Sequence, residues 1–184
     1  MTRLVAVFAS TAATAAAAPV ARAHAAPVRG PGAALCTSPK SIDPTGHAIE
    51  AEGVSLRIPR GYTISGSGGD YRVYSAGQRH IGVEWGRGPG EIESGGTLQS
   101  ISECRTVIDG RIVAISMFSW TRIDEAMAPS GDAGTKFLVV ARFPSVEGSH
   151  AVSVWIFTPF RGDAMQFRQV FWTVSFPSAP GEKR

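Results

Sequence analysis

The sequence predicts an α+β fold, in which an antiparallel β-sheet carries a C-terminal amphipathic helix packed on one face. Short segments alternate apolar and polar residues and are separated by glycine-rich turns, which is typical of strands with one buried face. Asp109-Gly110 lies between two runs of β-forming residues and predicts a two-residue hairpin turn. A mostly-β sandwich is the alternative. The helix is predicted from four apolar residues with the spacing of a helical stripe: Phe167, Val170, Phe171 and Val174.

The first strands are expected between residues 54 and 85. Residues 54–58 alternate strictly, and Pro59 ends the segment because proline cannot donate to a strand ladder. Residues 71–75 and 81–85 predict two more strands. The serine- and glycine-rich stretch 65–70, just before the strand at 71–75, is expected to form a flexible turn.

The remaining strands follow the Asp109-Gly110 turn. The second strand of that hairpin is expected to reach Trp120, and residues 136–143 and 150–158 predict two further strands, which could form another hairpin. Residues 151–157 are apolar on both faces, which is typical of a sheet covered on both faces. We therefore expect a second cover, supplied either by a helix at 97–104 or by the N-terminal arm.

The C-terminal helix is expected to begin near Gly162, with Asp163 as its N-cap. This placement also gives a structural explanation for Arg161-Gly162-Asp163, which spells an adhesion tripeptide. Residues 173–176 are rich in β-formers, which favours an early end of the helix.

At its two ends this pattern resembles the PsbP-like fold. Residues 54–62 (Val-Ser-Leu-Arg-Ile-Pro-Arg-Gly-Tyr) look like the first strand and the Pro-x-Gly-aromatic turn of such domains. Residues 167–176 are similar to their closing helix with its Ser-Phe end. The resemblance covers roughly residues 50–177. It implies an antiparallel sheet sandwiched by helices, and an accessory, assembly or binding role more often than catalysis.

The N-terminus predicts export. Residues 1–25 have a charged start, an uncharged run and small-residue cleavage sites, which is the order of a signal peptide. Retention as a membrane anchor and lipidation at Cys36 are the alternatives. We divide the chain into the signal peptide 1–25, a Pro/Gly/Ala-rich arm 26–47, a single globular domain 48–177 and a tail 178–184.

Charge argues against nucleic acid as a partner. The predicted signal peptide takes Arg3 and Arg22 from the 18 basic residues and none of the 15 acidic ones, so the mature chain is close to neutral. It has no block of Lys and Arg, which a nucleic-acid site would need. Contact with the membrane is expected only transiently, through the signal peptide.

The chain has two cysteines, Cys36 and Cys104, and an even count in an exported domain predicts one disulfide. Free thiols or an incomplete metal site are the alternatives. We expect no catalytic, cofactor or metal residues, because no nucleophile elbow, zinc motif or phosphate loop is present. As a possible binding surface we single out Trp85 and Trp120, which end strands beside the long loops 86–96 and 124–134.

These observations favour an extracytoplasmic (periplasmic or secreted), non-enzymatic accessory or binding protein of the bacterial envelope, with an unknown protein or small-molecule partner. A small secreted hydrolase is one alternative, and it would need a histidine and a carboxylate within hydrogen-bond reach in a cleft. A small-ligand carrier is the other, and it would need an apolar pocket of several hundred Å³.

Overall fold

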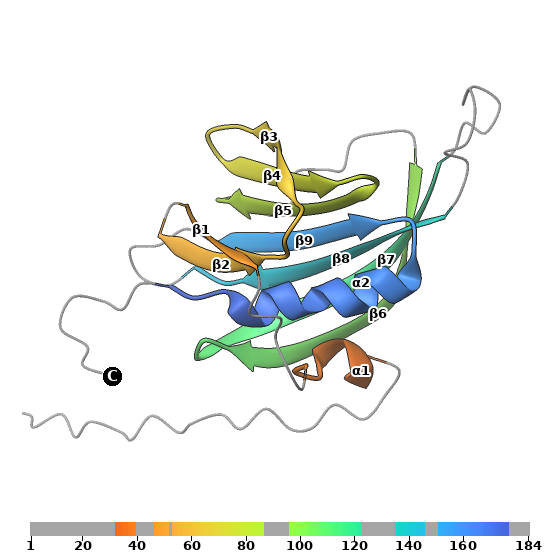
Figure 1. Cartoon of the computed structure of the whole chain (residues 1–184). Helices are drawn as coiled ribbons and strands as arrows, with labels where there is room; N and C mark the ends of the chain where they lie inside the picture. Colours follow the sequence, from red (N-terminus) through yellow and green to blue (C-terminus); the bar gives the residue numbers. More distant parts are fainter. Residues whose placement is uncertain are drawn as a thin grey trace, which may run out of the picture.

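The computed structural model describes residues 32–39, 46–51, 53–86, 96–122, 135–145 and 151–176. Its main element is a seven-stranded sheet in the order β3-β4-β5-β9-β8-β7-β6, in which every pair is antiparallel (Figure 1). A second sheet has two strands, β1 and β2. The strands are β1 His47–Ala51, β2 Val54–Ile58, β3 Thr63–Ser67, β4 Tyr71–Ala76, β5 Arg79–Trp85, β6 Gly96–Ile108, β7 Arg111–Arg122, β8 Lys136–Phe143 and β9 Val152–Thr158. The helices are α1 Ala33–Cys36, α2 Arg161–Phe167 and the 3-10 helix η2 Arg168–Thr173.

One face of the large sheet is covered. The helices α1 and α2 and the β1–β2 pair lie on the same side of it, toward the viewer in Figure 1. Burying apolar side chains between these layers removes them from water and supplies the main stabilisation of the fold. Leu35 of α1, Leu56 of β2 and Phe171 of η2 join the same hydrophobic core. Its central cross-strand row is fully buried: Tyr74, Ile81, Ile156, Val139 and Met117.

The disulfide ties α1 to the sheet. Cys36 and Cys104 are bonded, with their Cα atoms 6.0 Å apart, so the predicted pairing is present. Cys104 lies on edge strand β6 and points to the covered face, where it pairs with Ile115 of β7. Helix α1 has only four residues, too few to be stable without tertiary contacts. The bond therefore fixes the described start of the chain against the edge of the sheet.

The opposite face of the sheet, called the second face below, carries the alternate residues of each strand. No described helix or second sheet lies on it. The expected helix at 97–104 is wrong, because these residues form most of β6 and pair with β7. The arm does not supply the cover either within the described ranges, because α1 lies on the first face.

The Asp109-Gly110 hairpin is confirmed. Asp109 has a φ of 47° and Gly110 a φ of 75°, the two positive values that a tight hairpin turn between twisted strands requires. The turn also holds the last described residue, because the Asp109 carboxylate accepts the backbone N–H of Phe176 at 2.9 Å. The Arg111 guanidinium stacks on the Phe176 ring, 3.5 Å from its centroid.

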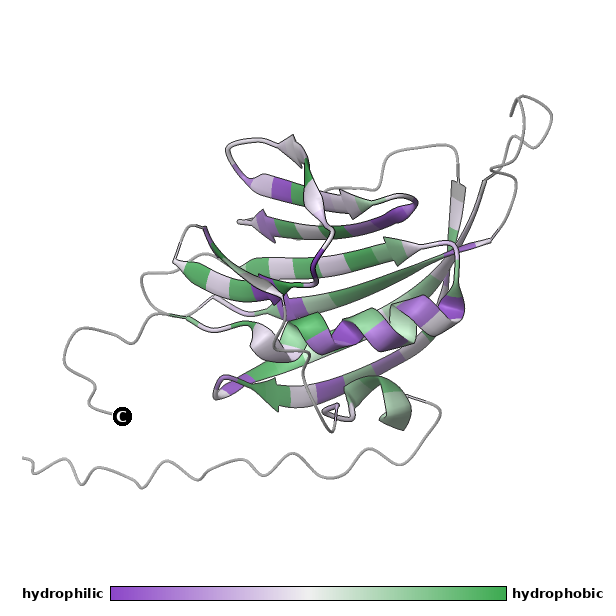
Figure 2. Cartoon of the chain, in the orientation of Figure 1, coloured by the Kyte–Doolittle hydropathy of each residue, from purple (hydrophilic) through white to green (hydrophobic). Residues whose placement is uncertain are grey.

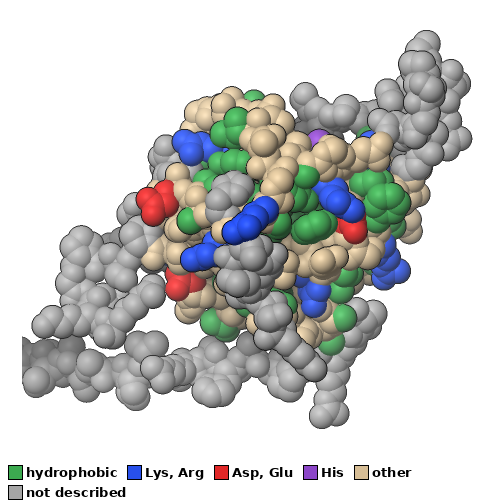
Figure 3. Space-filling view, in the orientation of Figure 1, with side chains coloured by type: hydrophobic (Ala, Val, Ile, Leu, Met, Phe, Trp, Pro, Cys, Tyr) green, Lys and Arg blue, Asp and Glu red, His purple; other side chains and the backbone are tan. Residues whose placement is uncertain are grey.

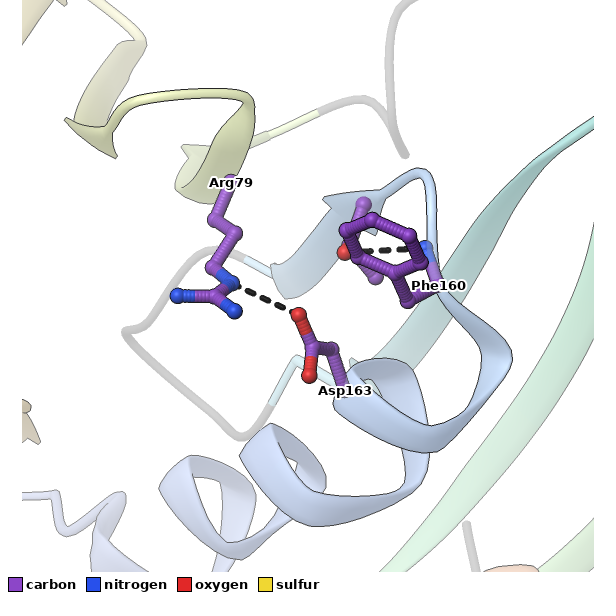
Figure 4. A network of polar contacts seen from close by, with 4 residues as sticks. Arg79, Phe160 and Asp163 are labelled. Atoms are coloured by element: carbon purple, nitrogen blue, oxygen red, sulfur yellow. Dashed lines mark hydrogen bonds and ion pairs between the residues drawn. The ribbon is translucent and has the colours of Figure 1, made fainter. Parts of the chain in front are cut away.

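The C-terminal helix differs from its prediction at its start. Helix α2 begins at Arg161, its N-cap is Phe160, and no side chain caps it. The predicted cap role of Asp163 is therefore wrong: this carboxylate lies in the first turn and accepts a hydrogen bond from the Arg79 Nε at 2.6 Å (Figure 4). The helix tightens into η2 and ends before Val174, as the β-forming residues there predict.

The two segments that carry the family resemblance contact each other. Ser55 and Ser175 form a backbone bridge, and the Thr173 hydroxyl accepts the backbone N–H of Arg57 at 2.8 Å. The Tyr62 ring packs edge-on against Phe167, with 5.9 Å between centroids. Strand β2, its turn and the closing helix therefore form one unit on the covered face.

The expected turn at 65–70 is only partly correct, because residues 65–67 belong to β3. This strand lies at the sheet edge and four of its five residues are exposed, so the apolar alternation that marks a half-buried strand is missing from the sequence. Figure 2 shows the contrast: green bands alternate with near-white ones along β9, whereas purple, hydrophilic bands occur along β4 and β5.

On the face shown in Figure 3, Lys and Arg side chains are scattered among hydrophobic and polar ones and do not form one block. Among the described helices, none is both long and apolar enough to cross a membrane.

Candidate functional site

The two predicted surface tryptophans are both buried. Trp85 is 6% exposed and belongs to the hydrophobic core of the covered face. Trp120 is 9% exposed and lies on the second face, where it pairs with Lys136. Within the described part of the chain, neither indole N–H has a hydrogen-bond partner. The loops expected beside them, 86–96 and 124–134, fall almost entirely outside the described residues.

A group of aromatic side chains occupies the middle of the second face. The Trp155 indole lies directly over Gly82, where an added Cβ would come within 2.0 Å of it. Its N–H donates to the Glu84 carboxylate at 2.8 Å. Phe157 packs edge-on against Trp120 at 6.0 Å between centroids. Aromatic packing and the Trp155 hydrogen bond therefore hold this part of the face in one arrangement.

A histidine lies beside this aromatic group, at the end of the sheet formed by β3 to β5. The His80 Nδ1 and the Ser75 hydroxyl are 2.7 Å apart, and the Ser75 hydroxyl lies 2.5 Å from that of Ser65. Burial, with the positive charge of Lys136, holds the pKa of His80 below its usual value. In the part of the chain that the structure describes, no carboxylate hydrogen-bonds His80. His80 therefore does not form, with the described residues, the histidine–carboxylate pair that the hydrolase alternative names.

The second face also carries a pocket of about 390 Å³ at the end nearest the Asp109-Gly110 turn. This volume lies within the usual range for small-ligand sites, roughly 300–1,000 Å³. Most of the lining is apolar, and Ile112, Ala114 and Pro144 contribute to it. The charged part of the lining consists of Arg105 and Arg142.

The strand register explains why the two arginines line the same pocket. Arg105 of β6 and Arg142 of β8 both pair with Ala114 of β7, so all three side chains point to the same face. Adjacent strands are about 4.8 Å apart, which places the two arginine backbones about 10 Å from each other. The methyl group of Ala114 leaves the space between them open. Ser153 of β9, which pairs with Arg142, adds a hydroxyl to the same row.

Neither arginine is used by the fold. Both are exposed, and neither guanidinium makes a hydrogen bond or an ion pair with the residues that the structure describes. Glu103 lies on the same side of β6, two residues before Arg105, but does not line the pocket or pair with the arginine. The described lining contains no carboxylate. Among the residues that the structure describes, these two guanidinium groups therefore keep all their donors available.

Sequence reasoning missed Arg105 and Arg142. The sequence places each arginine within a predicted strand, and both strands are present in the structure. It does not show that the two arginines lie near each other. The two arginines flank Ala114 only because β6 and β8 both pair with β7 in this register. The order β8-β7-β6 could not be derived from one sequence. No group of three or more His, Cys, Asp or Glu side chains suited to a metal ion occurs among the described residues.

Comparisons with known proteins support the fold. Neither a protein-family model nor a curated protein matches the sequence. The solution structure of cyanobacterial PsbP from Synechocystis sp. PCC 6803 is similar, with a TM-score of 0.52 and 10% identity, over 78% of this chain and 99% of that one. A crystal structure from Bacteroides thetaiotaomicron has a TM-score of 0.51 and 10% identity; the match covers 76% of this chain but spans only about half, 51%, of that one. The predicted resemblance to PsbP-like domains is confirmed as a resemblance of fold.

Proposed function

We propose that this chain is a non-enzymatic binding protein that works outside the cytoplasm and holds a small ligand on the second face of its sheet. The observation that carries the proposal is the 390 Å³ pocket there, lined by apolar side chains and by two arginines that have no polar partner among the described residues. An open, mostly apolar concavity with a few polar groups is the usual form of a ligand site. Of the functions expected from the sequence, the small-ligand carrier is the one whose structural requirement this pocket meets.

The place of action rests on two supports. The first 25 residues have the pattern of a signal peptide, although they lie outside the described residues. The Cys36–Cys104 disulfide is typical of proteins that fold in an oxidising compartment. The likeness to PsbP adds a fold in which accessory and binding roles are common, and we propose that the covered face of the sheet, with α1, α2 and the β1–β2 pair packed on it, corresponds to the sandwich of such domains.

Intact-mass measurements on the chain recovered from its native host test this proposal. Under denaturing conditions we expect a chain that begins near His24 or Ala26 and gains about 2 Da on reduction, because two thiols replace one disulfide. Under native conditions we expect an additional bound mass of small-molecule size.

Two results would contradict the proposal. A full-length mass with free thiols would remove the extracytoplasmic assignment. A native mass equal to the denatured polypeptide mass, in protein purified without detergent or organic solvent, would remove the carrier function.

A further inference from the structure

The pocket on the second face has a defined polarity, which restricts what it can hold. At one side stand the guanidinium groups of Arg105 and Arg142, and around them the described lining is apolar apart from the Ser153 hydroxyl. Arginine remains charged at any physiological pH and offers five N–H donors in a planar fork. A neutral ligand would leave these donors unused, whereas an oxyanion can accept from both groups at once.

We propose that the pocket binds the anionic head of a small amphiphile, a carboxylate or phosphate group, between Arg105 and Arg142. The proposal rests on the proposed ligand-binding function and names the chemical class of the ligand. The two arginines share one register position, one on each side of Ala114, and both line the same pocket. Carboxylates and phosphates fit such forks with paired, charge-assisted hydrogen bonds.

Ser153 strengthens the oxyanion site. It is 5% exposed and lines the pocket. A serine hydroxyl that lines the pocket can donate a hydrogen bond to an acceptor that enters it. It stands in the same cross-strand row as the two arginines, next to Arg142. Within the pocket the row presents three donor groups. Glu84, the next residue of the row beyond Ser153, does not line the pocket and accepts the Trp155 N–H.

The apolar part of the ligand has a place on the same face. Ile112 lines the pocket and is 52% exposed, and its cross-strand partner Val107 is 46% exposed. Two large apolar side chains that stay in water beside a charged pair favour a ligand with an apolar body. The pocket volume allows a short chain or a single ring rather than a long lipid tail.

The test uses three eight-carbon probes and the mature chain labelled with ¹⁵N. Octanoate supplies a carboxylate head, octyl phosphate supplies a phosphate head, and 1-octanol supplies the same chain without charge. We expect at least one anionic probe to shift the amide signals of Ala114 and Ser153 and to bind about tenfold or more tightly than octanol. The anionic probe that binds more tightly identifies the head group. Raising the salt concentration should weaken its binding, because salt screens exposed charges.

Arg105→Gln and Arg142→Gln should each weaken binding of the anionic probe about tenfold or more, and the double variant should bind it no better than octanol. Arg161→Gln is the matched control, because Arg161 is an exposed arginine at the start of α2 and makes no contact with the pocket. It should bind as the wild type does. Because all three arginines are exposed, these variants should fold normally, which their amide spectra will show.

Three results would overturn the inference. Octanol could bind as tightly as the anions, or the two arginine variants could bind them as the wild type does, or neither anion could bind at all. None of these removes the proposed function if the protein from its host still carries a bound mass. In that case the ligand would be neutral or would bind elsewhere, so the two proposals fail separately.

Discussion

Tyr62 shows how a single residue can couple this fold to pH. Its side chain is buried, and its hydroxyl has no hydrogen-bond partner among the described residues. Burial raises the pKa of Tyr62 to about 12, while the nearby Arg79 charge lowers it and the Asp163 charge raises it. In the unfolded chain the phenol titrates near 10. The folded state therefore holds this proton more tightly than the unfolded state does.

This difference predicts a loss of stability between pH 10 and about 12. In that window the unfolded chain releases the Tyr62 proton and the folded chain keeps it, so the free energy of unfolding falls as the pH rises. Tyr62→Phe should be as stable as the wild type at pH 8, or slightly more so, because it removes an unpaired hydroxyl. It should also lose less stability above pH 10. Urea denaturation at pH 8, 10 and 11 measures both effects.

Tyr71→Phe is the control for this experiment, because Tyr71 is 40% exposed. It should lose stability above pH 10 as the wild type does. Identical losses in the Tyr62→Phe variant and the wild type would show that the phenol is not held in its protonated form by the fold.

Gly82 is the second residue whose role can be measured alone. A methyl group there would meet the Trp155 indole at 2.0 Å, so the ring must move and its hydrogen bond to Glu84 must break. Overpacking of this kind usually costs about 1–3 kcal/mol. We therefore expect Gly82→Ala to lower the free energy of unfolding by about that amount and to change the tryptophan fluorescence of the folded state.

Gly162→Ala is the matched control. Gly162 lies in α2 with open space around it, so alanine should leave stability unchanged or raise it by up to about 1 kcal/mol. If both variants melted at the same temperature as the wild type, the position of the Trp155 ring over Gly82 would be refuted.

At the scale of elements, the disulfide joins the shortest helix to an edge strand. Replacing both Cys36 and Cys104 by serine should lower the free energy of unfolding by about 2–5 kcal/mol, since the unfolded chain regains the freedom that the cross-link removed. The amide protons of α1 should then exchange faster, whereas those of β8 and β9 in the sheet centre should still exchange last. Denaturation and hydrogen exchange, compared with the oxidised wild type, measure the two effects. Equal unfolding midpoints would contradict this role of the disulfide.

Elements with a strong local signal could be predicted from the sequence. The Asp109-Gly110 turn has the residue types that its backbone angles demand, and residues 136–143 were predicted with the bounds that β8 has. Strands β3 and β6 lie at the two edges of the sheet, where one side of the strand is unpaired and alternation is weaker. That is why the sequence predicts a turn at 65–67 and leaves a helix at 97–104 as one of two alternatives for the second cover. Asp163 stands where an N-cap residue is expected. Its actual partner, Arg79, is 84 residues away in the sequence, so the sequence does not show that contact.

The candidate site was less predictable than the fold for a related reason. Trp85 and Trp120 were chosen because they end strands, but side-chain burial depends on which face each one occupies, and Trp85 faces the core. Arg105 and Arg142 become a pair only through the strand order around β7. A single sequence shows the alternation within a strand and does not show its neighbours.

At the scale of the whole molecule, the two faces of the sheet differ in structure, and we propose a different role for each. The first face is covered by α1, α2 and the β1–β2 pair and supplies the core. On the second face Trp155 is packed over Gly82 and hydrogen-bonded to Glu84, and a pocket there is lined in part by Arg105 and Arg142. A rigid sheet with one covered and one working face is a suitable scaffold for a binding site.

The most direct test of this account is the native mass of the host-derived protein, compared between the wild type and Ala114→Trp. Ala114 forms the floor between the two arginines, and an indole in its place would fill the pocket while leaving both guanidinium groups in the chain. We predict a bound small-molecule mass on the wild type and its loss from the folded variant. The same bound mass on both proteins would place the ligand elsewhere and contradict the assignment of the second face as the working surface.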